Sequence, residues 1–217
     1  MFRRNPWHEV ISGLGEPPPF LRILLVFLAL GCFADTVDAG RLVVEHFRLG
    51  PEVWQQGELW RVVTYGFIGH GGISAWSVVQ LVLVYWLVQQ MVTWLRAPRA
   101  RNVLLGGVVF AGATATLVQV VSNRIGGPVS LWGPFWMIQG QAVLIAIGLA
   151  SFAANNRYST VSHTPFLFGL SIPSRWIVPL QLLMALAGAV SSGDVGGFAG
   201  VVAATAWGWT QSMPRPA

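Results

Sequence analysis

The sequence has no lysine, a single cysteine and few charged residues. Only 10% of its 217 residues are charged, whereas 54% are hydrophobic. A soluble domain carries roughly a quarter charged residues, so this composition cannot cover a surface exposed to water. It excludes a soluble enzyme, a disordered chain and a coiled coil. The lone Cys32 also excludes an intrachain disulfide and a cysteine-based metal site.

The basic residues are all arginines, 13 of them, and the formal net charge is +5. They lie in short segments between apolar blocks, without the interleaved aromatics of a nucleic-acid track. We therefore interpret them as topology determinants and expect no nucleic-acid partner. None of the 4 histidines lies at the centre of an apolar block, and no two have the spacing of a metal pair. No metal site and no cofactor are expected.

The apolar blocks are long enough to cross a bilayer, which requires about 20 residues per helix. They predict an all-α membrane protein built as a six-transmembrane-helix bundle, domain 20–212. A cytoplasmic N-terminal segment, 1–19, precedes this domain, and a short C-terminal tail, 213–217, follows it. The expected spans are 20–44, 73–95, 103–121, 135–152, 176–190 and 191–209.

The first predicted span is the weakest, because Asp35 and Asp38 interrupt it. It reaches spanning length only if the two carboxylates lie at the far headgroup boundary, where they face water or pair with Arg41. The stretch 45–72 that follows is too polar to cross and too aromatic for a free loop. We expect it to lie in the membrane interface.

An even number of spans places both termini on one side of the membrane. The positive-inside rule assigns that side to the cytoplasm. The absence of lysine favours a GC-rich genome and hence a bacterial inner membrane. The arginines placed inside are Arg3, Arg4, Arg96, Arg99, Arg101, Arg157 and Arg215.

The interfacial stretch contains the run 58–65, with Trp60 next to Arg61. This run resembles the Trp-Arg motif in the first loop of the rhomboid superfamily. The resemblance implies a rhomboid-like six-helix bundle with an interfacial first loop. It also implies that the Arg61 guanidinium, with its five donors, ties together carbonyl groups of the loop.

The positions that match the catalytic groups of rhomboid proteases carry other residues. Where such proteases have Gly-x-Ser-Gly, the sequence reads Gly140-Gln141-Ala142-Val143, so Ala142 replaces the nucleophile. Asp194 stands where the last span has histidine. On the oxyanion side, Trp76 and Gln80 replace histidine and asparagine. Without serine and histidine there is no nucleophile–base pair, so we predict a pseudoprotease and not an enzyme.

The run Gly140-Gln141-Ala142 is similar to the Gly-Gln-Ala-Phe stretch of Derlins, the non-proteolytic branch. The segments 78–85 and 165–170 are similar to Derlin segments too. This resemblance implies a protein of membrane-protein quality control that binds client transmembrane segments and locally perturbs the bilayer. The implied partners are membrane lipids, client membrane proteins and a membrane protease or AAA ATPase. Gln80 and Asp194 depart from the Derlin pattern, and no recruiting motif follows Trp209.

Several polar and small residues have roles expected from physics alone. Gln80 and Gln141 lie within predicted spans, where each favours a helix–helix hydrogen bond or lines a hydrated notch. Asp194 is expected to cap the last span at its N-terminus. Small residues at helical spacing predict close packing of that span, through Gly193, Gly196, Gly197 and Gly200.

Two alternative functions fit parts of the sequence. An intramembrane serine protease would have to use Ser130 and His70, both expected on the outer side. A small transporter would use Asp194 with the span glutamines. Spans four and five are also short if Trp132, Trp136 and Trp176 anchor them at the interface, and short spans thin the surrounding bilayer.

Overall fold

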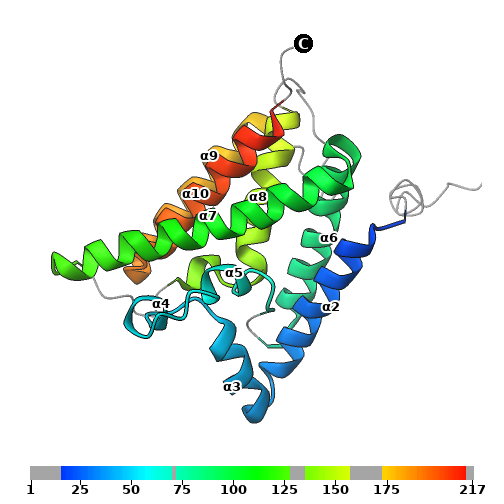
Figure 1. The fold of residues 1–217 in the computed structure, drawn as a ribbon. Coiled ribbons are helices and arrows are strands. Elements are labelled where there is room, and N and C mark those ends of the chain that lie inside the picture. The colour runs from blue at the N-terminus through cyan, green and yellow to red at the C-terminus, as the bar shows by residue number, and fades with distance from the viewer. Residues whose placement is uncertain (1–15, 70–71, 128–134, 157–172, 214–217) are drawn as a thin grey trace, which may run out of the picture.

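The computed structural model describes residues 16–69, 72–127, 135–156 and 173–213, and their regular secondary structure is all helical (Figure 1). The predicted all-α class is therefore confirmed for the described residues. The α-helices are α2 (Pro19–Ala34), α3 (Asp38–Phe47), α4 (Glu52–Gln55), α5 (Arg61–Thr64), α6 (Ala75–Leu95), α7 (Ala97–Arg124), α8 (Gln141–Asn155), α9 (Ile177–Ser192) and α10 (Val195–Ser212). Two 3-10 helices are η1 (Trp136–Ile138) and η2 (Ser174–Trp176).

Three helical segments of the described chain are long and apolar enough to cross a membrane, namely Ala75–Leu95, Ala97–Arg124 and Ser174–Ser192. The apolar helices α2 and α8 are shorter, with 16 and 15 residues. Large apolar side chains are exposed on several helices, among them Phe27, Trp76 and Met184. Soluble monomers rarely expose extended apolar patches, so these surfaces suit hydrocarbon and indicate a membrane protein.

The prediction of one continuous span over 20–44 is wrong. Helix α2 ends at Ala34, and the separate helix α3 begins at Asp38. An ionised side chain in hydrocarbon requires a partner, and the Asp35 carboxylate, directly after α2, accepts from Arg48 Nη2 at 2.8 Å. The predicted partner, Arg41, instead pairs with Glu45 one helical turn away, at 3.4 Å.

Other predicted boundaries shift as well, and the last span begins at Val195 instead of 191. Helix α7 is longer than the predicted span 103–121, beginning at Ala97 and ending at Arg124. Helix α8 begins at Gln141, six residues after the predicted start at 135, because η1 and the positive-φ residue Gly140 precede it. With φ of 54°, Gly140 adopts a conformation that side chains with a Cβ avoid.

The six longest α-helices of the described chain alternate in direction. At one end, which we call the elbow end, the start of α7 lies beside the end of α10: Arg99 Nη2 donates to the Gln211 carbonyl at 2.9 Å. At the other end, the loop end, helices α3–α5 and η1 gather (Figure 1). There the Gly140 N–H, just before α8, donates to the Tyr65 carbonyl at 3.0 Å. The alternation brings residues of the first loop onto the start of α8.

The core lies between α7, α8 and α10. Two glycines of α10 allow this close packing. A Cβ atom added at Gly200 would lie 3.3 Å from the Ala111 carbonyl of α7, and one added at Gly208 would lie 2.5 Å from the Ile147 carbonyl of α8. Helix α8 is surrounded by α6, α7, α9 and α10, which leaves it interior. Helix α2 packs on α6 and α3 at the side of this core.

Candidate functional site

Arg61 is the centre of the first loop. Its side chain is buried, and Nη1 donates to the carbonyls of Glu45 at 2.7 Å and Arg48 at 3.1 Å. The expected carbonyl contacts are therefore present, and they join the end of α3 to α5. Nε forms an ion pair with Glu58, and Nη1 lies 3.7 Å from a carboxylate oxygen of Glu52. Two carboxylates thus balance a buried cation, as burial of a charge requires.

Trp60, the other residue of the motif, has a different position. Its side chain is 44% exposed, and its ring lies 5.6 Å from the ring of His46 on α3. An indole at the loop end, half exposed beside a polar segment, is typical of a membrane-interface aromatic.

The first loop lies on the chain that leads into α8. The side-chain amide of Gln139 pairs with the backbone of Leu49 in both directions: Nε2 donates to the carbonyl at 2.7 Å and Oε1 accepts from the N–H at 3.3 Å. The Tyr65 hydroxyl donates to the Val108 carbonyl at 2.9 Å, which fastens the same loop to α7. Burial raises the pKa of Tyr65 above its ordinary value, so the phenol stays protonated and remains a donor.

The residues matched to the protease serine motif lie at the start of α8, below this loop. Gln141 is 1% exposed, and its Nε2 lies 3.1 Å from Cys32 Sγ of α2, so it forms the helix–helix contact expected of it. Ala142 follows in the first turn of α8 and is half buried. A methyl group at this position supplies neither a nucleophile nor a proton donor.

Asp194 is fully buried, and within the part of the chain that the structure describes its carboxylate accepts from backbone N–H groups. It is the N-cap of α10, where Oδ1 accepts from the Gly197 N–H at 2.9 Å, as predicted. Oδ1 also accepts from the Phe135 N–H at 2.9 Å, and Oδ2 from the Met137 N–H at 3.3 Å. The carboxylate therefore joins α10 to η1, a connection across nearly 60 residues that capping alone did not predict.

The oxyanion-side positions are apart from these contacts. Trp76 is 68% exposed in the first turn of α6. Gln80 lies one turn further, half buried, on the helix face shared by the buried residues Ser77 and Val84. Its predicted helix–helix hydrogen bond is not found within the described residues, whereas an unpredicted one joins Gln181 Nε2 of α9 to Thr205 Oγ1 of α10 at 2.8 Å.

The four glycines predicted to pack the last span have three different roles. Gly196 and Gly200 face α7, as expected of packing glycines. Gly193 lies outside α10 and ends α9 in the left-handed conformation, with φ of 73°. At Gly197 an added Cβ would meet the Asp194 carboxylate.

Sequence reasoning missed three features of this region: Gln139, the Asp35–Arg48 pair and the contact of Gly208 with α8. The only feature of the sequence that could have indicated the role of Gln139 is its position as a glutamine after the end of a loop. No group of three metal-ligating side chains occurs among the described residues. The alternative protease pair, Ser130 and His70, and the Derlin-like segment 165–170 lie outside the described residues, as do Arg3, Arg4, Arg157 and Arg215.

No protein-family model matches the chain, and no curated protein matches it either.

Proposed function

We propose that the protein is a non-catalytic, rhomboid-like membrane protein that binds client transmembrane segments in membrane-protein quality control. In this proposal α2, α6, α7, α8, α9 and α10 are the six spans, with both termini in the cytoplasm of a bacterial inner membrane. Support comes from the alternating directions of these helices and from the Arg61 contacts in the first loop.

The observation that carries the proposal is the chemistry at the start of α8. Ala142 stands at the position matched to the nucleophile, and Asp194, at the position matched to histidine, accepts from three backbone N–H groups. A general base acts on the proton of a nucleophile within its reach, and the Ala142 methyl group has no such proton. The residues Ala142 and Asp194 therefore support a protein that binds its client segments without covalent chemistry. The same three hydrogen bonds argue against Asp194 as the proton carrier of a transporter.

A client helix would bind at the lateral surface formed by α6 and α9. Both helices pack on α8, and each exposes large apolar side chains, for example Val78 and Val82 on α6 and Leu183 and Met184 on α9. Gln80 adds a half-buried polar group that a partner helix can satisfy. The implied further partner is a membrane protease or AAA ATPase.

The test is photocrosslinking in membranes. A benzophenone amino acid replaces Gln80 in one variant and Leu117, which is 67% exposed on α7, in the control. We expect polypeptide adducts to membrane proteins from position 80 and few from position 117. Equal adducts from both positions, or none from either, would overturn the proposed client surface.

A second experiment tests the absence of protease chemistry. Purified protein is treated with a fluorophosphonate serine probe beside the Ser130→Ala variant. We expect no labelling of folded protein. Labelling that disappears in the variant would make Ser130 a nucleophile and contradict the pseudoprotease assignment.

A further inference from the structure

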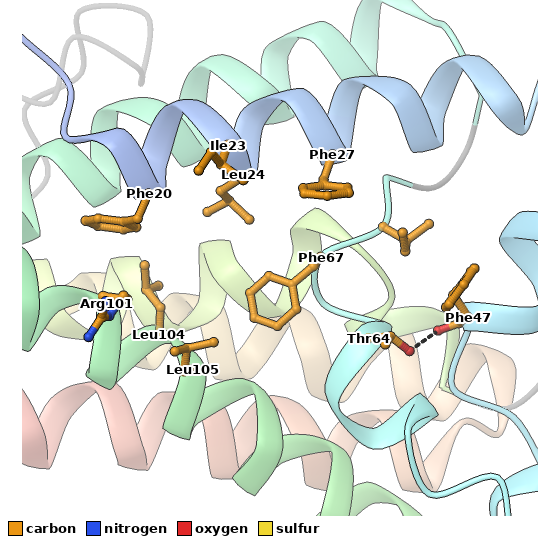
Figure 2. Close-up of a pocket in the computed structure, with 11 residues that line it drawn as sticks. Phe20, Ile23, Leu24, Phe27, Phe47, Thr64, Phe67, Arg101, Leu104 and Leu105 are labelled. Carbon is orange, nitrogen blue, oxygen red and sulfur yellow. Dashed lines mark hydrogen bonds between the residues drawn. The ribbon is translucent and has the colours of Figure 1, made fainter.

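A groove of about 520 Å³ lies between α2 and α7, away from the positions matched to the protease site (Figure 2). Its walls come from α2, the first loop and the first turns of α7. Figure 2 shows Phe20 and Arg101 at one end, Phe67 in the middle, and Phe47 with Thr64 at the other end. The volume falls within the range of about 300–1,000 Å³ that is usual for small-molecule sites.

The lining is apolar except for Thr64 and Arg101. The Thr64 hydroxyl lies 3.0 Å from the Phe47 carbonyl and 3.1 Å from the Trp60 carbonyl, so its proton is already donated within the loop. Arg101 is exposed and forms no ion pair or hydrogen bond with another described residue. Among the described residues that line it, the groove therefore presents an apolar surface with Arg101 as an unpaired cation at its elbow end.

The start of α7 is rich in positive charge. Arg96 and Arg99 lie within five residues of Arg101, and no acidic residue occurs between positions 59 and 193. Before α2, the Glu16 carboxylate lies 3.4 Å from Arg22 Nη2, so this acid is paired with an arginine of α2. A ligand that fits this end must carry a negative charge, and a ligand that fits the rest must be apolar.

We propose that this groove binds an anionic phospholipid, with one acyl chain between α2 and α7 and the phosphate on Arg101. A guanidinium matches a phosphate with two parallel hydrogen bonds. The apolar lining runs the length of the groove, so an extended acyl chain can follow it from Phe20 past Phe67 to Phe47.

This inference is independent of the client-binding proposal, because it uses neither α9 nor the start of α8. It requires only that the elbow end of the protein lies at a membrane surface.

The test is native mass spectrometry of the full chain, titrated with phosphatidylglycerol and phosphatidylcholine of identical acyl chains. We expect Arg101→Gln to weaken phosphatidylglycerol binding about tenfold, the usual effect of losing a charge-assisted hydrogen bond. Arg96→Gln removes a like charge five residues earlier, between α6 and α7, but Arg96 does not line the groove, so this variant should change binding less than about twofold.

A second variant tests the acyl-chain part of the site. Leu105 lines the groove and is 41% exposed, so Leu105→Trp fills space without disturbing the core. It should weaken binding of both lipids. Equal effects of Arg101→Gln and Arg96→Gln, equal affinity for the two lipids, or unchanged binding in Leu105→Trp would overturn the proposal.

Crosslinking identifies the occupant directly. A benzophenone amino acid at position 105, irradiated in membranes, should give an adduct with the mass of a phospholipid. An adduct with a polypeptide would overturn the lipid assignment and would place a client segment in the groove.

Discussion

At the scale of single residues, the buried polar side chains of the loop end bond mainly to backbone groups. Arg61 donates to carbonyls of α3 and its C-terminal cap, and Asp194 accepts N–H groups from η1 and α10. Such bonds satisfy loop backbone that would otherwise be buried without partners. These two side chains therefore hold irregular segments in place near the start of α8.

We expect Arg61→Gln to lower the free energy of unfolding by about 3–5 kcal/mol, because it leaves Glu58 and two carbonyls without their buried partner. Thermal or denaturant unfolding, followed by tryptophan fluorescence, measures the effect. Arg41→Gln is the control: its exposed pair with Glu45 is worth about 0.5 kcal/mol. Similar losses in the two variants would contradict the role given to Arg61.

Asp194→Ala should lower the free energy of unfolding by about 3 kcal/mol or more, because three backbone N–H groups lose their acceptor. Asp194→Asn retains one acceptor oxygen and should lose less. The same unfolding assay ranks the two variants. An alanine variant as stable as the wild type, with altered proton-coupled uptake, would favour a transporter instead.

At the scale of elements, the described helices pack through glycines placed where backbones meet. The tightest contact between long helices is at Gly208 of α10, where an added Cβ would lie 2.5 Å from the Ile147 carbonyl of α8. A carbonyl in a buried helix cannot move aside as a side-chain end can. Helix α10 can therefore approach α8 only with glycine at this position.

Gly208→Ala should lower the melting temperature, with a loss of about 1–3 kcal/mol typical of overpacking. Gly188→Ala in α9 is the matched control, since its added Cβ would meet side-chain atoms of Met137, at 3.3 Å, and Trp136, at 3.8 Å, and no backbone. Differential scanning fluorimetry compares the two variants under identical detergent conditions. Equal tolerance of both substitutions would show that the α8–α10 contact is looser than described.

At the scale of the whole molecule, the short helices differ in their exposure to lipid. Helix α8 has 15 residues but is interior, so its length has little effect on the bilayer. Helix α2, with 16 residues and a length of about 24 Å, exposes Ile23, Val26 and Phe27. We therefore expect α2, and not spans four and five, to thin the bilayer. Its length is shorter than the hydrocarbon core, which is about 30 Å thick.

We expect thinner lipid density beside α2 than far from the protein in a cryo-EM map of the chain in a lipid nanodisc. The helix Ala97–Arg124 provides the internal control, since its 28 residues exceed the bilayer thickness. Density of ordinary thickness along α2 would contradict the prediction.

Most of the helices could be predicted from the sequence, because apolar blocks of spanning length have few alternatives to helix in hydrocarbon. The membrane class, the helices near 73–95, 103–121 and 176–190, and the Asp194 cap follow from composition and from local spacing. Asp35 and Asp38 marked the interruption of the first span locally, whereas the partner of Asp35 could not be predicted, because Arg48 lies 13 positions away.

Composition and hydropathy alone predict an apolar, helical chain suited to a membrane. The partners of Arg61, Asp194 and Gln139, and the groove beside Arg101, became visible only in the folded chain. The difference is one of range. Hydrophobicity and capping act over one or two helical turns, whereas these contacts depend on how helices far apart in the chain meet.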